Sequence, residues 1–124
     1  SYGDNLARCQ RYYLMIASGA VVCSDGGYTE RIGVGYFHVN TSFFFIRDIP
    51  VQLRAVPSLE TVTGTNYFNI ERDGSEDNCD TVAFRSSSRS ILSMKADSVS
   101  GTQGQGGLIH INNTAARVAV SSEL

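Results

Sequence analysis

The chain offers few residues for proton transfer or metal binding. His38 and His110 are its two histidines, and neither stands in an H-x-H or H-E-x-x-H pattern that would indicate a metal site. The G-x-S-x-G pattern that places a serine nucleophile at a sharp turn is absent. Each histidine lies in an apolar or aromatic context, which is more typical of packed side chains than of catalytic bases. We predict no catalytic residue and no metal ligand.

Carboxylates are the other residues that could do chemistry. A pair for glycoside cleavage can come from distant strands, and no sequence feature indicates one. The most acidic stretch, Asp73–Asp80 (DGSEDNCD), is rich in oxygen ligands and admits a calcium site. It lacks the full calcium-loop pattern with a terminal bidentate Glu, so a solvated hairpin tip is the favoured interpretation.

Aromatic side chains are the main candidates for ligand binding. The chain has six Tyr, six Phe and no Trp. Tyr28 lies beside a glycine-rich turn, and Tyr36 and Tyr67 lie in predicted strands, where an exposed ring could stack on a sugar. His38 shares a strand face with Tyr36, so we include it among the candidates. The alternative for each is a half-buried packing residue, which is the commoner role of a strand Tyr.

The cysteines indicate no particular site. Cys9, Cys23 and Cys79 show no CxxC spacing, and an odd number leaves at least one free thiol. We favour buried small side chains in a protein made in a reducing cytoplasm. A structural zinc site and a single disulfide are the alternatives.

Composition limits the class of partner. The 124 residues fit one domain, 1–124, and only 18% are charged. The net charge of −2 provides no basic field for a phosphate backbone, so we predict no nucleic-acid partner. Nine of the ten basic residues are Arg, and these favour planar contacts of the kind found in subunit interfaces.

The N-terminus has no basic segment that leads into an apolar one, as a targeting signal would have. No apolar stretch approaches the roughly 20 residues that cross a bilayer, so we predict a soluble chain without membrane insertion. The first residue is Ser1 rather than Met, and we expect a missing N-terminal portion.

The elements that must position these residues are mostly strands. Residues 3–11 suit a short helix with Asp4 as its N-cap. Within 29–39, Ile32, Val34, Tyr36 and His38 share one predicted face, and Gly33 and Gly35 admit a close backbone approach. The remaining strand-length segments are 12–17, 20–23, 43–46, 61–72, 81–84, 89–96, 108–111 and 116–124. We therefore predict an all-β antiparallel sandwich, jelly-roll-like, with eight or nine short strands after a helical lead-in.

The middle of the chain joins a buried strand to a rigid arm. Phe43–Ile46 places large side chains on both faces, which predicts burial on both sides. Pro50 and Pro57 remove backbone donors and favour an extended, partly paired arm between them. Arg54 lies midway along this arm. We predict that the Arg54 guanidinium is partly buried there. Its predicted role is to anchor the structure rather than to bind a ligand.

Three segments in this order resemble a known family. They are LARCQRYY at Leu6–Tyr13, IPVQLRAVPSL at Ile49–Leu59 and a hydrophobic final strand ending in Glu123 and Leu124. The chain is similar to the C-terminal domains of bacteriophage tail fibres, tail spikes and related virion proteins. In that group C-Q-R-Y-Y opens the domain, P-x-x-[LM]-R-x-x-P-[ST] marks its middle, and a short strand ends it.

The resemblance implies a β-sandwich at the distal end of a homotrimeric fibre, in the virion tail, made in the host cytoplasm. It implies host-surface recognition, commonly of glycans, or trimer assembly, and no cofactor. The residues that match the family motifs are interpreted as structural: Cys9, Gln10, Arg11, Tyr12, Tyr13, Pro50, Arg54 and Pro57.

Three functional hypotheses follow. The first is a non-enzymatic, trimeric host-binding module at the tip of a tail fibre. The second is a structural domain that locks or caps the trimer and has no ligand of its own. The third is a small glycan-modifying enzyme, an esterase or a hydrolase, of which this chain would be the accessory part.

Overall fold

The computed structural model describes residues 1–10 and 12–122. One helix and ten strands follow one another along this part of the chain. Their bounds are α1 (Tyr2–Gln10), β1 (Tyr13–Ser18), β2 (Arg31–Val39), β3 (Ser42–Asp48), β4 (Ser58–Val62), β5 (Phe68–Arg72), β6 (Ser75–Cys79), β7 (Ala83–Phe84), β8 (Ile91–Asp97), β9 (Gly106–Ile111) and β10 (Arg117–Ser121).

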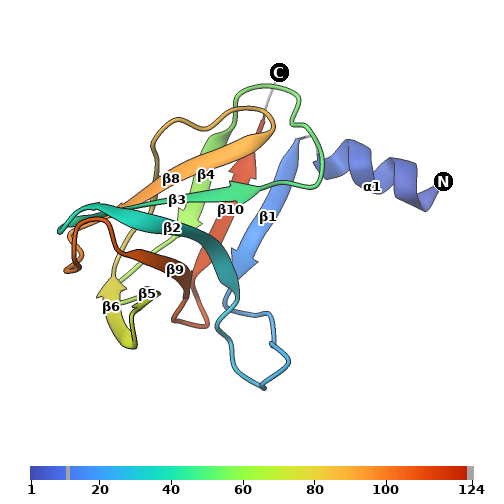
Figure 1. The fold of residues 1–124 in the computed structure, drawn as a ribbon. Helices are drawn as coiled ribbons and strands as arrows, with labels where there is room; N and C mark the ends of the chain where they lie inside the picture. Colours follow the sequence, from blue (N-terminus) through green and yellow to red (C-terminus); the bar gives the residue numbers. More distant parts are fainter. Residues whose placement is uncertain (11, 123–124) are drawn as a thin grey trace.

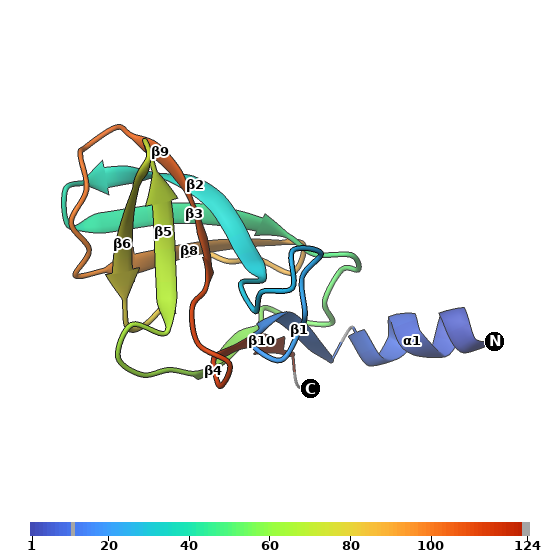
Figure 2. The same ribbon diagram turned by 90° about the horizontal axis from the view of Figure 1, so that it is seen from below.

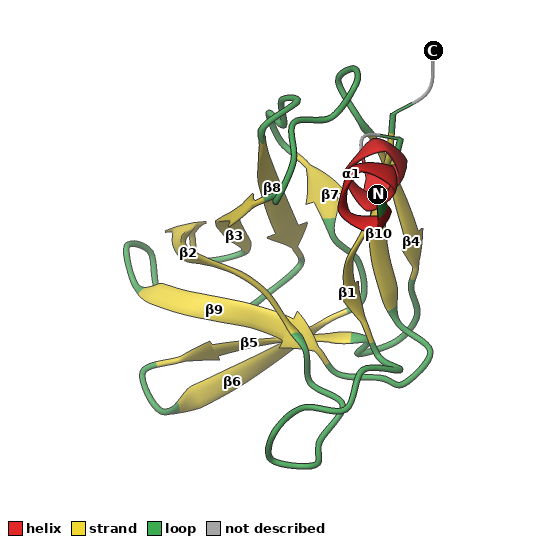
Figure 3. Cartoon of the chain, turned by 90° about the vertical axis from the view of Figure 1, so that its right-hand side faces the viewer, coloured by secondary structure: helices red, strands yellow, loops and turns green. Residues whose placement is uncertain are grey.

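The strands form two antiparallel sheets. A large sheet has seven strands in the order β6-β5-β9-β2-β3-β8-β7, and a small sheet has three in the order β1-β10-β4. Figure 1 and Figure 3 show the small sheet standing beside the curved large sheet. This arrangement confirms the predicted all-β sandwich with a short N-terminal helix.

The winding of the chain has one feature of a jelly roll. β1 pairs with β10, β2 with β9 and β3 with β8, so three antiparallel pairs are nested. However, β2 and β3 are neighbours in one sheet, and the two sheets are unequal in size. The described part of the chain holds ten strands rather than the predicted eight or nine. The acidic β6 is additional, and the predicted strand 61–72 is divided between β4 and β5.

The core lies between the sheets and inside the curve of the large sheet. Phe37 of β2 packs edge-on against Phe43 of β3, with 5.1 Å between ring centroids, and Phe45 stacks 6.0 Å from Phe43. These three rings are fully or almost fully buried, as is Phe68 of β5. Each buried Phe contributes roughly 1.5–3 kcal/mol through the removal of its surface from water.

The predicted two-sided burial of Phe43–Ile46 is wrong. Phe43 and Phe45 point into the core, whereas Phe44 is half-buried and the Ile46 side chain is 52% exposed. The reason is that the outer face of β3 has no second layer over it. Side chains alternate between the two faces of a strand, so every second residue of this apolar run meets solvent.

The predicted face of β2 is also corrected. The pairing of β2 with β9 shifts register between Arg31 and Gly33, which marks a β-bulge. A bulge inserts one residue and changes which face the following side chains occupy. Ile32 is therefore buried, whereas Val34, Tyr36 and His38 lie on the exposed face.

Local elements differ from the predictions at three places. Ser1, not Asp4, caps α1, because its Oγ accepts a hydrogen bond from the Asp4 N–H at 3.3 Å. Residues 20–23 form no strand, and both valines there are exposed. Most of Asp73–Asp80 is strand β6, and only the turn of the β5–β6 hairpin is a tip, at Asp73 and Gly74, which have positive φ values.

The arm between β3 and β4 is held by residues other than Arg54. The Leu53 N–H donates to the Arg89 carbonyl oxygen at 2.7 Å, and the Arg89 Nε donates back to the Leu53 carbonyl oxygen at 2.9 Å. Leu53 and Pro57 are buried, whereas Pro50 is exposed.

Arg54 itself is exposed, so the predicted burial of its guanidinium is wrong. Its contact is a cation–π interaction with Tyr12, whose ring centroid lies 5.4 Å from the Arg54 Cζ. Side chains alternate between the two sides of the extended arm, so Leu53 is buried and Arg54 is exposed. Arg11, the remaining predicted anchor, lies outside the described residues.

Helix α1 extends away from the two sheets (Figure 2). Most of its described side chains are exposed, including Tyr2 and Leu6. Among residues 1–10 and 12–122, the structure contains no helix that is long and apolar enough to cross a membrane.

Candidate functional site

Four side chains gather on the outer face of the large sheet, and we call them the aromatic surface. They are Tyr36 and His38 of β2, Phe44 of β3 and Arg85, which follows β7. Tyr36 is directly opposite Phe44 in the β2–β3 register. Two of the predicted ligand-binding residues, Tyr36 and His38, are therefore brought together with two that were not predicted.

The rings of the aromatic surface contact one another closely. His38 stacks on Phe44 with 4.5 Å between centroids and an interplanar angle of 11°. Tyr36 meets both rings edge-on, at 6.3 Å from His38 and 6.2 Å from Phe44. Such contacts contribute roughly 0.5–1.5 kcal/mol each and fix the orientation of the rings. The rings of the aromatic surface are therefore held in a defined arrangement.

Arg85 adds a cation to this surface. Its Cζ lies 4.1 Å from the centroid of the Phe44 ring, which is a close cation–π contact. The backbone of Arg85 is fixed to β8, because its N–H donates to the Ser93 carbonyl oxygen at 2.9 Å. Within the described part of the chain, no carboxylate or carbonyl accepts a hydrogen bond from the Arg85 guanidinium. Its planar N–H donors are therefore available to a ligand.

Apolar residues extend the aromatic surface along the same face. Val34 is 67% exposed, and Ile46, its partner in the β2–β3 register, is 52% exposed. A small cavity of about 90 Å³ lies among Ile46, Tyr36, Phe44 and Arg85. An exposed apolar face of this kind is typical of a binding surface.

The other two predicted ligand-binding residues lie elsewhere. Tyr28 is exposed in the loop between β1 and β2. Tyr67 is half-buried before β5, packs against the core, and covers Gly64, where an added Cβ would lie 2.8 Å from the Tyr67 ring. Among the described aromatic pairs, neither tyrosine contacts Tyr36, His38 or Phe44. Tyr67 is therefore a packing residue, which was the alternative to a ligand-binding role.

A second feature is a shallow groove of about 750 Å³ beside the β5–β6 hairpin. Glu71 of β5 and Glu76 of β6 line it, and the buried His110 of β9 lies behind them. No local sequence pattern indicates this combination, because its members come from three strands. Only the β5–β6 and β5–β9 pairings bring them together.

Two of the four carboxylates of the acidic stretch bind protein donors. Asp77 pairs with the Arg72 guanidinium, and the Asp80 carboxylate accepts a hydrogen bond from the Asn66 N–H at 2.8 Å. Among the described residues, the acidic stretch contributes only Glu76 to a cluster of metal-ligand type. The structure gives no support to a calcium loop at 73–80.

The cysteines form no disulfide. Cys9 is exposed, Cys23 is partly buried, Cys79 is buried, and all three are free. Burial raises the pKa of the Cys79 thiol to about 12, with a further contribution from the negative charges of Asp80 and Asp77. Cys79 is therefore a neutral packing residue at physiological pH.

The chain matches no protein-family model, and no similar curated protein or solved structure was found. The resemblance to phage fibre domains therefore stays a prediction from the three sequence motifs.

Proposed function

We propose that the chain is a non-enzymatic recognition module of a phage tail fibre, and that it binds a host-surface glycan through the aromatic surface. The observation that carries the proposal is the gathering of Tyr36, His38 and Arg85 around Phe44, at exposed positions on the outer face of the large sheet. The phage context rests on the three sequence motifs. The proposal places the chain in the virion tail, as part of a homotrimer.

The chemistry of the aromatic surface suits a carbohydrate. Sugar rings have apolar C–H faces that pack on aromatic rings, and Tyr36 and His38 offer such rings to solvent. Arg85 adds a planar group whose paired N–H donors match adjacent hydroxyls or a carboxylate. An acidic sugar would therefore use both components of the surface.

The third hypothesis, a hydrolase, receives no support from the histidines. In the described part of the chain, the one hydrogen bond of a histidine ring joins His110 Nδ1 to the Ile111 carbonyl oxygen. A hydrolase of the Ser-His type requires a nucleophile within hydrogen-bond distance of the base.

A structural trimerisation domain is the second candidate function. It is favoured by the outer face of the small sheet, where Tyr13, Met15 and Val62 are exposed beside Arg117. Exposed apolar side chains in one patch are typical of protein interfaces. The two functions use different faces of the molecule and are compatible with each other.

A glycan array with the fluorescently labelled chain tests the proposed function. We expect binding to a restricted set of bacterial surface glycans, with loss of about tenfold or more in affinity for Arg85→Ala, because the paired hydrogen bonds contribute a few kcal/mol. Arg54→Ala is the matched control, since Arg54 is also an exposed arginine stacked on an aromatic ring, outside the aromatic surface. Absence of binding to any glycan, or equal loss in the two variants, would refute the proposal.

A further inference from the structure

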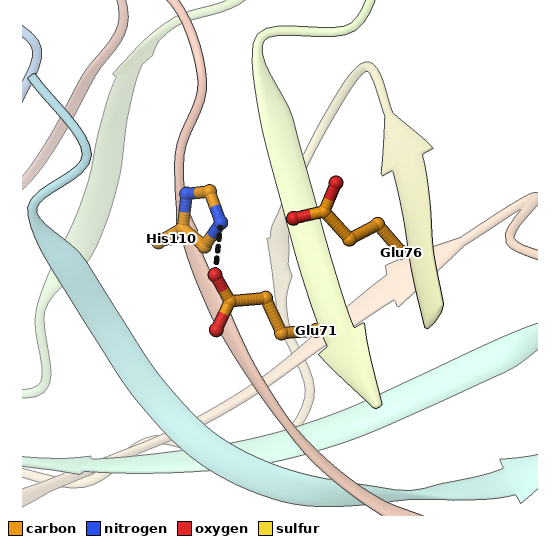
Figure 4. Close-up of side chains that lie close together, drawn as sticks. All are labelled: Glu71, Glu76 and His110. Carbon is orange, nitrogen blue, oxygen red and sulfur yellow. Dashed lines mark ion pairs between the residues drawn. The ribbon is translucent and has the colours of Figure 1, made fainter. Parts of the chain in front are cut away.

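Glu71, Glu76 and His110 form a cluster of potential metal ligands. One ligand atom from each lies within 4.8 Å of the others. Figure 4 shows the three side chains converging from β5, β6 and β9. Glu71 and Glu76 are directly opposite each other in the β5–β6 register. Like charges in this position repel each other, so a compensating positive charge is expected between them.

His110 carries the second, independent observation. Its side chain is 95% buried, and Nδ1 lies 2.7 Å from the Ile111 carbonyl oxygen. A carbonyl oxygen only accepts, so the hydrogen bond assigns the ring proton to Nδ1. The Nε2 atom of the neutral ring then carries a lone pair. This atom is buried, and among the described residues it has no hydrogen-bond partner.

The Nε2 atom of His110 points toward the carboxylates of Glu71 and Glu76 (Figure 4). It lies 3.2 Å from Glu71 Oε1, but without the alignment of a hydrogen bond. Directly opposite His110 in the register, the buried Asn69 Oδ1 likewise lacks a donor among the described residues. Several acceptor atoms therefore lie near one another around the buried His110 and Asn69 side chains.

One protein cation approaches the cluster, and it does so incompletely. Arg31 Nη2 lies 3.5 Å from Glu71 Oε1, while the Arg31 Nη1 donates to the Thr29 carbonyl oxygen and to the Thr29 hydroxyl, both at 2.8 Å. No described contact joins Arg31 to Glu76 or to Nε2. The acceptors of Glu76 and His110 thus stay without a positive partner.

We propose that Glu71, Glu76 and His110 bind one Zn²⁺ ion. The hydrogen bond from Nδ1–H to a backbone carbonyl is the arrangement that orients a metal-binding histidine. One imidazole nitrogen and two carboxylate oxygens suit Zn²⁺ better than Ca²⁺, which takes six to eight oxygen ligands. Bonds of about 2.0–2.2 Å place tetrahedral ligands about 3.4 Å apart. The three ligand atoms lie within 4.8 Å of one another, so the ion would draw them closer together, and the Glu76 side chain is exposed and has room to move.

The ion would join three strands of the large sheet and leave a fourth coordination position. Glu71 and Glu76 line the shallow groove, so this position opens toward solvent. The site does not depend on the proposed glycan function. It also departs from our sequence-based prediction that the chain has no metal ligand.

Titration with Zn²⁺ and with Co²⁺ tests the site. The parent for all variants carries Cys9→Ser and Cys23→Ser, which removes the two accessible thiols that would otherwise bind either ion. We expect one saturable equivalent of Zn²⁺ by calorimetry and a tetrahedral Co²⁺ absorption spectrum without thiolate charge-transfer bands. The melting temperature of the parent should rise with Zn²⁺, because the ion binds only the folded state.

Glu76→Gln is the decisive variant, because Glu76 is exposed and its replacement spares the core. We expect it to weaken Zn²⁺ binding by about tenfold or more. Glu60→Gln, at an exposed position of β4 in the other sheet, should bind Zn²⁺ like the parent. His110→Gln should abolish the Co²⁺ spectrum. If His110→Gln does not fold, the result for Glu76→Gln alone decides whether the cluster binds Zn²⁺. Absence of saturable binding in the parent, or unchanged binding in Glu76→Gln, overturns the proposal.

Discussion

Arg54 and Arg85 show how little a residue type reveals about its surroundings. Both are exposed and both stack on an aromatic ring. Arg85 belongs to a cluster of four side chains on the open face of the large sheet, whereas Arg54 contacts Tyr12 alone among the described rings. The clustering of Arg85, rather than its chemistry, is the reason that we propose it as a ligand-binding residue.

Asp97 supplies a prediction on pH dependence. The hydrogen bond from the Ser42 hydroxyl, followed by the contact with Lys95, lowers the pKa of the Asp97 carboxyl. A carboxyl whose pKa is lower in the folded state stabilises the fold above its unfolded pKa of about 3.9. This stabilisation is lost as the pH falls through the folded pKa. Ser42→Ala should therefore raise the pKa of Asp97 and flatten the loss of stability in acid.

The measurement is an NMR titration of the Asp97 carboxyl carbon in the parent and in Ser42→Ala. Lys95→Gln should give a smaller rise, because Lys95 is a lesser cause of the lowered pKa. An unchanged titration in Ser42→Ala would show that the hydrogen bond does not set the pKa of Asp97.

At the scale of elements, the positions of the strands could be predicted better than which face of each strand is buried. The alternation in 29–39 predicted a strand, and β2 is there. It also predicted one face for Ile32 and Val34, and the bulge between Arg31 and Gly33 separates them. A bulge is set by the pairing with β9, which is far away in the sequence, so the pattern within β2 could not reveal it.

Gly35 tests the close packing of β2 on β3. A Cβ at this position would overlap the Phe44 carbonyl oxygen, so Gly35→Ala must push the two strands apart. We expect a loss of about 1–3 kcal/mol or more in the free energy of unfolding, measured by urea denaturation. Gly106→Ala is the control on β9, because its Cβ would meet its nearest atom at 3.8 Å. Equal stability of the two variants would contradict the model of the β2–β3 contact.

The arm between β3 and β4 gives a second test of stability. Leu53 is fully buried, so Leu53→Ala should cost about 2–5 kcal/mol in the free energy of unfolding. Arg54→Ala removes an exposed cation–π contact and should cost no more than about 1 kcal/mol. Thermal and urea denaturation of both variants would check the order. A larger loss in Arg54→Ala would restore the original prediction of a buried anchor.

At the scale of the whole molecule, the pairing of strands that are far apart in the sequence determines which residues meet at the candidate site. Tyr36 and His38 share a strand, so their proximity was predictable from alternation. Phe44 and Arg85 join them only through the β2–β3 and β3–β8 pairings. The cluster of Glu71, Glu76 and His110 likewise depends on three strands, and no local pattern in the sequence indicates it.

The oligomeric state is a prediction for the whole molecule. The outer face of the small sheet exposes Tyr13, Met15 and Val62, and α1 extends beyond the sheets. We expect a homotrimer, in which these apolar residues and Arg117 are buried between subunits. Light scattering after size exclusion at micromolar concentration measures the mass directly. A monomer mass would contradict the fibre-tip arrangement.

The central claim is that the outer face of β2 and β3 binds carbohydrate. An NMR titration of the ¹⁵N-labelled chain with array-positive oligosaccharides tests it most directly. We predict saturable shifts concentrated at Tyr36, His38, Phe44 and Arg85, with little change in β1, β4 and β10. Shifts confined to the small sheet, or no saturable shifts with any of these oligosaccharides, would contradict the claim.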